Sequence, residues 1–373
     1  MLTWPSMLLI GAAARNVGKT EFACRMLKRF AAAQTPAIGV KITVVREESG
    51  GCPRGGAGCG VCGSLTEPFT ITFEENAPSA KDTGRMVAAG ASKVFWLRVK
   101  SAHLNEGVNV LKAMIDPSVP VVAESNSARL ALEPGLFLII QTDADESVKK
   151  SCKAVMHFDH VPVLFKGTGW DINPDDIVFV NKTWAEKLSA TAVILAGGKS
   201  SRMGTDKSLL PINGIPMIKY IADQLQPVFK EVIISSNDPD KFAFLSLPVV
   251  RDKTPDCGPI MGIYSALAAA AHTRVFVTGC DIPVMHQAFI REMYELAGNH
   301  AIVMPKSGDA FEPLYAFYQK KSLPAFEQAL KNSQRRVVAV LEHCQAVHPA
   351  MPAGSWYVNL NTIEDYRAQL DIV

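Results

Sequence analysis

The sequence predicts an α/β protein made of two three-layer α/β/α domains, with a boundary near residue 189. Three observations predict this class. Short apolar, β-branched runs alternate with helix-like stretches in both halves, which is the pattern of parallel sheets covered by helices. A glycine-containing loop follows an apolar run in each half, in GAAARNVGKT and in LAGGKSSRMGTDK. The chain of 373 residues is also long enough to bury two ordinary cores.

Composition limits the kinds of partner that we expect. The chain is 48% hydrophobic and 20% charged, and its net charge of +2 comes without the basic stripe of a nucleic-acid-binding protein. No apolar run reaches the roughly 18 residues of a membrane span, and the N-terminus lacks the basic segment of a signal peptide. We therefore expect a cytoplasmic, soluble protein that binds neither nucleic acid nor membranes, and the oligomeric state stays open.

The first half, residues 1–188, begins as an alternating α/β fold. The pattern predicts a strand from residue 8, a helix over 21–33 and a strand over 37–45. Residues 47–67 then carry glycines and cysteines without periodicity, which indicates an insertion. The later predicted elements are regular structure within 82–99, strands over 119–125, 135–142, 154–159 and 176–182, and a helix over 183–188.

The second half, residues 189–373, repeats the alternation without repeating the sequence. Strands are predicted over 191–196, 231–237, 248–252, 274–283 and 300–306, and helices over 216–228 and 262–271. Open sheets of this kind bind ligands at the carboxyl ends of their strands. The residues that follow the strands are therefore the first candidates for a site.

The first loop has most of a phosphate-binding P-loop. Gly18, Lys19 and Thr20 stand where that loop needs a backbone cradle, a phosphate-binding lysine and a Mg²⁺-binding hydroxyl, ahead of a predicted helix. Ala13 replaces the first glycine and allows the backbone less freedom. The sequence thus predicts a P-loop NTPase-like domain, and the alternative is a purely structural P-loop domain.

The middle loop suits nucleotide chemistry of another kind. Gly197 and Gly198 let a phosphate or a purine edge approach the main chain, and Arg202 and Lys207 add positive charge. A lysine at this distance can stabilise the charge that develops as pyrophosphate leaves. Asp281 follows a strand and predicts a Mg²⁺ ligand, because Mg²⁺ takes one or two carboxylates together with phosphate and water oxygens. The alternative for Asp281 is a turn former.

Five ordered stretches carry a resemblance to a known family. LAGGKSSRMGTDKSLLPINGIPMI, VVRD, CGPIMGI, CDIP and YVNLNT resemble the molybdenum cofactor guanylyltransferases over about residues 190–373. The resemblance implies a Rossmann-like nucleotidyltransferase domain that transfers GMP from GTP to molybdopterin with Mg²⁺. It implies catalytic roles for Lys207, Asp281 and Arg202, nucleotide contacts for Leu195, Ala196, Gly197, Gly198, Lys207, Asp252 and Asp281, a Mg²⁺ ligand in Asp281, and contacts to molybdopterin or metal for Asn359 and Asn361.

Two positions bear on the substrate. The family often has an asparagine where this chain has Ser235, and Asn237 follows two residues later. LAGG, rather than the LAAG usual in the related cytidylyltransferases, favours guanine. A cytidylyltransferase of the same cofactor and a sugar-phosphate nucleotidyltransferase are the alternatives, and a binding-only module is the alternative from another class.

The first half carries a second resemblance. KDTGRMVAAGASKVF and VVAES are similar to the accessory P-loop GTPase of molybdopterin-guanine dinucleotide synthesis over about residues 7–180. This implies a domain that assists the transferase, with Thr20 as a Mg²⁺ ligand. Asp82, Arg85 and Glu124 are candidates for the rest of the site, or else surface ion-pair residues. Molybdoenzyme apoproteins or chaperones are candidate recipients of the product.

Two further patterns are open to a functional and a bland interpretation. Asn181 and Lys182 resemble the start of a guanine-reading NKxD motif, but Trp184 replaces its aspartate. His103, His157 and His160 could complete a metal site or be ordinary core or surface residues.

The insertion has a cysteine spacing that suits a metal. Cys52, Cys59 and Cys62 could bind Zn²⁺ or an iron-sulfur cluster, with Cys152 or a second subunit as the source of a fourth ligand. The alternative is a flexible loop with reduced cysteines.

Overall fold

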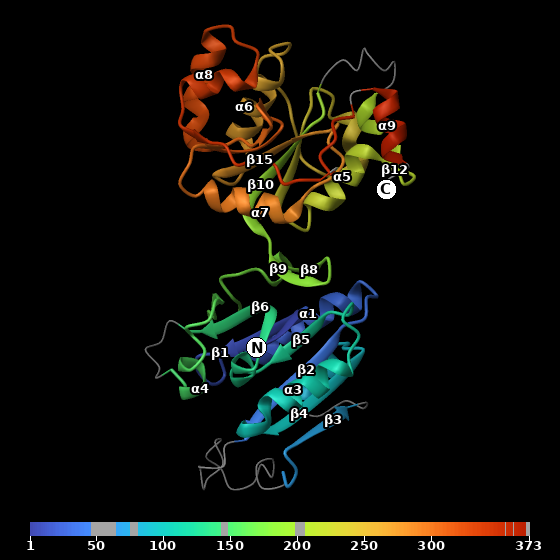
Figure 1. Ribbon diagram of the computed structural model, residues 1–373, viewed down its shortest axis with the longest axis vertical. Coiled ribbons are helices and arrows are strands. Elements are labelled where there is room, and N and C mark those ends of the chain that lie inside the picture. The colour runs from blue at the N-terminus through green and yellow to red at the C-terminus, as the bar shows by residue number, and fades with distance from the viewer. Residues whose placement is uncertain are drawn as a thin grey trace. The chain divides into compact units, whose positions relative to one another are not determined.

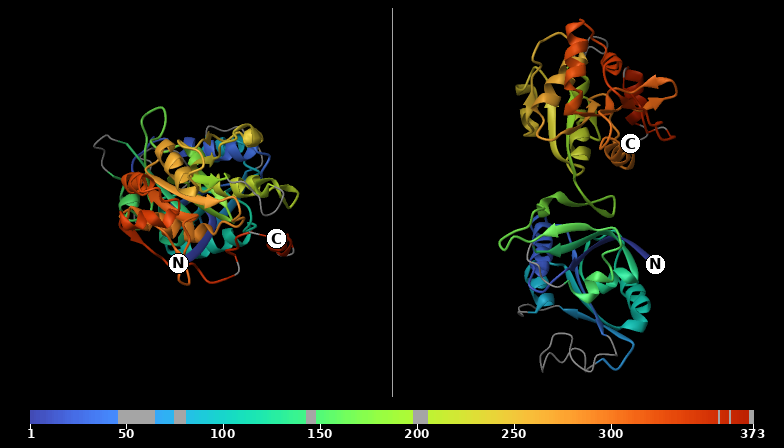
Figure 2. Two further views of the ribbon diagram at one scale, coloured as in Figure 1. Left: turned by 90° about the horizontal axis from the view of Figure 1, so that it is seen from above. Right: turned by 90° about the vertical axis from the view of Figure 1, so that its left-hand side faces the viewer.

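The structure is a computed structural model, and it divides into two compact units, Met1–Glu186 and Lys187–Val373. It describes residues 1–45, 65–74, 81–142, 148–197, 206–354, 356–360 and 362–370. Each unit has a seven-stranded sheet with helices on both faces (Figures 1 and 2). The predicted α/β class with parallel sheets is confirmed.

The sheet of the first unit has the order β3-β4-β2-β5-β1-β6-β7. All neighbours are parallel except β3, which runs antiparallel to β4 at the edge. The strands are β1 (Leu2–Ala12), β2 (Ile38–Val45), β3 (Phe69–Glu74), β4 (Lys93–Lys100), β5 (Val121–Glu124), β6 (Leu132–Gln141) and β7 (Val161–Leu164), and the helices are α1 (Lys19–Ala32), α2 (Asp82–Ala88), α3 (Leu104–Ala113) and α4 (Lys150–Lys153).

Strand alternation divides the apolar residues of the first unit between two cores. On β1, Leu8 and Ile10 pack with α1 and α2, whereas Met7 and Leu9 pack with α3. Successive side chains of a strand point to opposite faces, so a central strand that is apolar throughout must be covered on both sides. This requirement explains why β1 reads as a continuous apolar run.

The predicted helix over 183–188 is wrong, because these residues pair as a strand. A hairpin joins β8 (Ile177–Val180) to β9 (Thr183–Glu186), and Asn181 and Lys182 form its turn with φ values of 52° and 61°. Two successive residues with positive φ are the signature of the type I′ turn, in which asparagine is favoured. Trp184 is buried and donates its indole N–H to the Ser6 carbonyl oxygen at 2.9 Å.

One further prediction for the first half is wrong, and some elements of the first unit were not predicted. Residues 154–159, predicted as a strand, form a turn after α4, in which the Met156 N–H donates to the Cys152 carbonyl oxygen. Their buried apolar residue, Val155, packs as part of a helical turn rather than of a sheet. Strand β3 was not predicted, because its residues are only half-buried at the sheet edge.

The sheet of the second unit has the order β14-β13-β10-β15-β19-β16-β20. Strand β19 is antiparallel to both β15 and β16, and the other neighbouring pairs are parallel. Its strands are β10 (Leu188–Leu195), β13 (Phe229–Ser235), β14 (Val249–Val250), β15 (Arg274–Gly279), β16 (Ile302–Val303), β19 (Tyr315–Gln319) and β20 (Ala346–Val347), and two small hairpins join β11 (Pro211–Ile212) to β12 (Ile215–Pro216) and β17 (Lys306–Ser307) to β18 (Ala310–Phe311).

The helices of the second unit cover both faces of this sheet. On β10, Ala192 and Ile194 pack with α5 and α7, whereas Val193 and Leu195 pack with α6 and α8. The helices are α5 (Met217–Leu225), α6 (Pro259–Ala269), α7 (Gln287–Leu296), α8 (Leu323–Lys331) and α9 (Ile363–Leu370). Among the described residues, no helix has both the length and the apolar character needed to cross a membrane.

Strands β1 and β6 approach each other closely at Gly135. A Cβ atom at Gly135 would lie 2.0 Å from the Pro5 carbonyl oxygen, where the β1–β6 register shifts. Gly135→Ala should therefore lower the free energy of unfolding by about 1–3 kcal/mol, because the strand must move to make room. Gly169→Ala is the control, since a Cβ there meets nothing within 4 Å. Equal denaturant midpoints for Gly135→Ala and wild type would refute the prediction.

Candidate functional site

The loop after β10 leaves the sheet between two neighbouring strands. Leu195, the last residue of β10, pairs with Ser235 on β13 and with Gly279 on β15. The Ala196 N–H donates to the Ser235 carbonyl oxygen at 3.0 Å, and the Cys280 N–H donates to the Leu195 carbonyl oxygen at 3.1 Å. These bonds place Ala196 at the carboxyl edge of the sheet. Of the loop that follows, Gly197 is described, and Gly198 and Arg202 lie outside the described residues.

Asp281 lies at the same edge, two residues after β15. A Cβ atom at Gly279 would lie 2.4 Å from the Asp281 Oδ1, so the absence of a side chain at 279 leaves room for the carboxylate. Burial raises the pKa of the Asp281 carboxyl, and the Lys207 ammonium acts against this shift. The predicted phosphate-binding cation therefore acts electrostatically on the predicted metal ligand, although the two residues are far apart in the sequence.

A short helical turn holds Lys207. Its 3₁₀ helix, Lys207–Leu209, is capped by Asp206, whose Oδ1 accepts hydrogen bonds from the Ser208 N–H at 3.1 Å and the Ser208 hydroxyl at 2.6 Å. Lys241 pairs with the other oxygen of Asp206. The sequence analysis missed Asp206 and Lys241, although the Asp-x-Ser spacing of a capping turn was a signal for the first.

Asn237 fixes the side chain of Asp252, which is the predicted nucleoside contact. The Asn237 side-chain amide donates to Asp252 Oδ2 at 3.0 Å, and the Asp252 N–H donates to Asn237 Oδ1 at 2.9 Å. Ser235 instead faces Gly262, where a Cβ atom would lie 3.0 Å from its hydroxyl and 3.5 Å from Asp252 Oδ1. Ser235, Asn237 and Asp252 therefore border one region of the sheet edge.

The asparagine-containing segment near the C-terminus approaches Asp281. The Leu360 N–H donates to the Asp281 carbonyl oxygen at 2.9 Å. Next to it, Asn359 hydrogen-bonds to Tyr357, whose hydroxyl donates to Glu312 Oε2 at 2.6 Å. Burial is the main cause of the raised pKa of Tyr357. Asn359 thus adjoins Asp281, while Asn361 lies outside the described residues.

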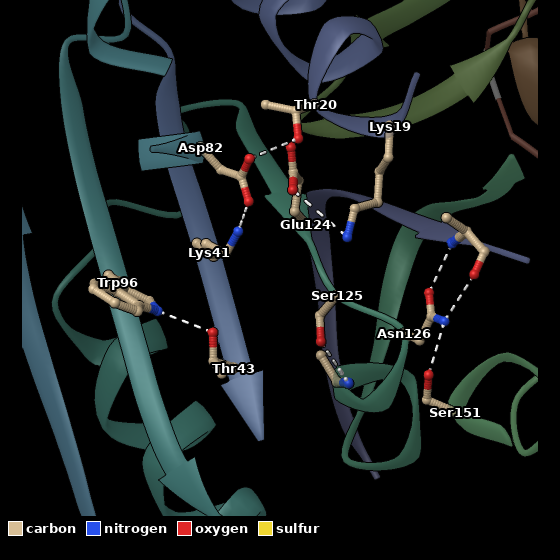
Figure 3. A network of polar contacts seen from close by, with 12 residues as sticks. Lys19, Thr20, Lys41, Thr43, Asp82, Trp96, Glu124, Ser125, Asn126 and Ser151 are labelled. Carbon is tan, nitrogen blue, oxygen red and sulfur yellow. Dashed lines mark hydrogen bonds and ion pairs between the residues drawn. The ribbon is translucent and has the colours of Figure 1, made fainter. Parts of the chain in front are cut away.

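The first unit has a second, separate constellation after β1. The loop to α1 contains Asn16 and Gly18 with φ values of 58° and 74°, and α1 begins at Lys19. The left-handed backbone at residue 18 suits glycine. Lys19 Nζ lies 3.6 Å from Glu124 Oε2, at the end of β5 (Figure 3). The predicted P-loop lysine and the predicted partner carboxylate therefore meet.

Two carboxylates face this loop. The Thr20 hydroxyl donates to Asp82 Oδ1 at 3.2 Å, and Lys41 of β2 pairs with Asp82 (Figure 3). The Glu124 side chain is fully buried, and neither of its carboxylate oxygens accepts a hydrogen bond from a described residue. Thr20, Asp82 and Glu124 are residues that the sequence predicts for this site, and the structure shows them near the loop. Lys41 is not predicted from the sequence, because a lysine within a strand carries no motif of its own.

Asn126 links the start of the loop after β1 to Ser151 of α4. Its Oδ1 accepts from the Ala12 N–H at 2.7 Å, and its Nδ2 donates to the Ala12 carbonyl oxygen at 3.0 Å and to Ser151 Oγ at 3.2 Å (Figure 3). The Lys149 N–H also donates to the Ala13 carbonyl oxygen at 2.9 Å. The start of α4 is thereby tied to the end of β1.

A cavity of 1130 Å³ lies over this loop. Arg85, predicted to belong to the site, lines it and pairs with Glu21 at 2.6 Å. The lining residues that bear charge are Arg15, Lys19, Glu21, Asp82, Arg85, Lys149 and Lys150. The described lining thus contains five cationic side chains and two carboxylates, so the cavity suits an anionic ligand.

The other predicted site residues take structural places or lie outside the described residues. Asn181 and Lys182 form the β8–β9 turn, and no described contact supports a guanine-reading role for them. Cys152 is fully buried in an apolar core, and burial raises the pKa of its thiol.

No metal-binding cluster is described in the first half. His103 pairs with Glu106, and the described residues contain no group of three His, Cys, Asp or Glu side chains able to hold a metal ion. The His157 ring packs at a tilt against the Phe158 ring, and His160 contacts the Phe158 carbonyl oxygen. Cys52, Cys59 and Cys62 lie outside the described residues, so their metal site stays a prediction.

Comparison with known proteins bears on the second unit. A family model for the MobA-like NTP transferase domain matches residues 192–347. A probable molybdenum cofactor guanylyltransferase of Carboxydothermus hydrogenoformans is 32% identical over 49% of this chain and 95% of its own length. Another, of Pelotomaculum thermopropionicum, is 38% identical over 40% of this chain and 74% of its own length.

One solved structure that is similar to part of the chain can be named. Molybdopterin-guanine dinucleotide biosynthesis protein A of Archaeoglobus fulgidus is 22% identical and covers 49% of this chain and 97% of its own, with a TM-score of 0.43. The family model, and the relative that is 32% identical over 95% of its own length, show the family of the chain. Through residues 192–347 it belongs to the MobA-like NTP transferase family, and it is a nucleotidyltransferase.

Proposed function

We propose that the second unit transfers GMP from GTP to the terminal phosphate of molybdopterin, releasing pyrophosphate. The observation that carries this proposal is the place of Asp281 at the carboxyl edge of the sheet, two residues after Gly279, which pairs with Leu195 at the start of the glycine loop. The Lys207 ammonium acts on the same carboxylate, because it opposes the rise in pKa that burial causes. The curated relatives are molybdenum cofactor guanylyltransferases, which supports this reaction over the cytidylyl and sugar-phosphate alternatives.

The residues at this edge fit a Mg²⁺ ion. Asp281 offers one carboxylate, and Mg²⁺ commonly takes one or two from the protein and its other ligands from substrate phosphates and water. When bound, the ion would neutralise charge on the phosphate oxygens. Asp281 would hold the ion. Asn359 borders the same region, because the next residue, Leu360, donates its N–H to the Asp281 carbonyl oxygen.

The protein residues would position the two substrates and neutralise the charge of their phosphates. The phosphate of molybdopterin is the nucleophile, its attack on the α-phosphorus of GTP forms the new P–O bond, and the bond to pyrophosphate breaks. Lys207 would bind the phosphates and stabilise the charge on the leaving pyrophosphate. Leu195, Ala196 and Gly197 would contact the guanine through the main chain, and Asp252, held by Asn237, would contact the nucleoside.

For the first unit we propose a P-loop site for a nucleoside triphosphate that assists the transferase. Gly18, Lys19 and Thr20 would bind the phosphates at the start of α1, where backbone amides favour anions. Thr20, with Asp82 beside it, would hold a Mg²⁺ ion. The buried carboxylate of Glu124 is the further group suited to that cation or to a water, because it accepts no hydrogen bond from a described residue.

The direct test of the main proposal is product analysis. Purified protein is incubated with molybdopterin, Mg²⁺ and one nucleoside triphosphate at a time. The guanine dinucleotide and pyrophosphate should form with GTP. A dinucleotide that forms with CTP and not with GTP would overturn the guanylyl assignment, and turnover of sugar phosphates alone would overturn the molybdopterin assignment.

Removal of the charge of either Lys207 or Asp281 should strongly slow the transfer. Asp281→Ala and Lys207→Ala should each lower the rate by roughly a hundredfold or more, because each loses several kcal/mol of charge stabilisation in the transition state. Pyrophosphate release measures this rate. Lys219→Ala is a matched control, since Lys219 forms an exposed pair with Asp223, and it should keep wild-type activity. A near-normal rate for Asp281→Ala would contradict the assignment.

The two units should have separable chemistry. Lys19→Ala should weaken nucleotide binding by the first unit, because the lysine is the phosphate cation of that loop. With GTP, Mg²⁺ and molybdopterin in excess, it should leave guanylyl transfer near normal. Equilibrium nucleotide binding and pyrophosphate release are measured on the same preparation. Loss of transfer in Lys19→Ala would show that the two loops act as one site.

A further inference from the structure

An aromatic side chain forms part of the cavity over the first loop. Phe165 follows β7 directly, and its N–H donates to the Gln141 carbonyl oxygen at 2.7 Å, which continues the ladder between β6 and β7. It is half-buried and lines the cavity that Gly18, Lys19 and Thr20 also line. Among the described lining residues it is the one aromatic side chain.

The ring lies against the last glycine of the loop. A Cβ atom at Gly18 would be 2.9 Å from Phe165 Cε2 and 3.0 Å from Cδ2. Gly18 therefore serves two purposes, since its φ of 74° suits glycine and its missing side chain lets the ring approach. Because Lys19 follows Gly18, the ring stands next to the predicted phosphate-binding residues.

Neighbouring aromatic rings fix the position of Phe165. Phe165 pairs through its backbone with Trp170, and their ring centroids are 6.1 Å apart. Trp170 in turn packs edge-on against Phe22 of α1, with centroids 4.9 Å apart. The ring is thus anchored to the same helix whose N-terminus carries the P-loop lysine, so it needs little ordering when a ligand binds.

The cavity has room for more than a phosphate chain. Its 1130 Å³ exceed the space that most small-ligand pockets offer, which is about 300–1,000 Å³. Lys149 and Lys150 add charge along the wall that leads from the loop. A triphosphate seated on Gly18 and Lys19 would leave space beside Phe165 for the attached nucleoside.

We propose that Phe165 is the nucleobase-stacking surface of the first unit, a proposal that rests on the proposed P-loop site. Aromatic faces stack on any base, because every base has a π face. Asn181 and Lys182 only resemble the start of a guanine-reading motif, whose aspartate is replaced by Trp184, and they form a hairpin turn. Phe165 is the aromatic face that the described lining of the cavity offers to a base. The ligand class is a nucleoside triphosphate, held by its phosphates and by its base.

The test separates base binding from phosphate binding. Phe165→Leu keeps an apolar side chain against Gly18 but removes the aromatic face, and Phe165→Tyr retains that face. Affinities for GTP, ATP and inorganic tripolyphosphate are measured with Mg²⁺ on the full chain. A Lys207→Ala background reduces nucleotide binding by the second unit, and only the binding that Lys19→Ala abolishes is counted.

Phe165→Leu should bind GTP and ATP about tenfold more weakly, in keeping with the contribution of a base–aromatic stack, and should bind tripolyphosphate as the unsubstituted chain does. Phe165→Tyr should bind all three ligands normally. Phe73→Leu, at an aromatic residue that is 44% exposed and does not line the cavity, is the matched control and should change nothing.

Three outcomes would overturn the proposal, and they differ from one another. Unchanged nucleotide affinity in Phe165→Leu would show that the base does not stack on this ring. An equal loss for nucleotides and tripolyphosphate would show that the ring only shapes the loop. If the chain with Lys19 intact binds neither ligand in a Lys19-dependent way, the P-loop site itself fails and the stacking surface fails with it.

Discussion

The register of two strand pairs sets the position of both candidate sites. In the first unit, Ile10 of β1 pairs with Glu124 of β5, and the loop after β1 carries Lys19. In the second, Leu195 of β10 pairs with Gly279 of β15, two residues before Asp281. Parallel strands end at one edge, so this pairing brings each carboxylate to the loop of the neighbouring strand. A shift of either register by one residue would move the carboxylate to the other face of its sheet.

Local packing and hydrogen bonds then orient the candidate functional side chains. Gly279 leaves space for the carboxylate of Asp281, and Asn237 orients Asp252 through two hydrogen bonds. In the first unit, Asn126 fixes the end of β1, because it forms hydrogen bonds with both the N–H and the carbonyl oxygen of Ala12. Each arrangement satisfies a polar group at the sheet edge, and a group held in this way needs little reorganisation when a ligand arrives.

Sequence alone predicts those candidate site residues that chemistry restricts to particular residue types. Lys19, Thr20 and Asp281 were predicted, because phosphates and Mg²⁺ require such groups after a strand. Lys41 and Lys241 were not, since a lysine that pairs with a distant aspartate leaves no local pattern. The sequence does not reveal strand β9, because four residues are too few to show a period and the pairing of β9 depends on a turn at Asn181.

The two proposed nucleotide sites can be counted without turnover. Equilibrium dialysis with a non-hydrolysable GTP analogue and Mg²⁺ measures the number of molecules bound per chain. If each unit binds its own nucleotide, saturation should reach two molecules per chain, one at the loop after β1 and one at the loop after β10. Saturation at a single molecule per chain would show that the two loops do not form two independent sites.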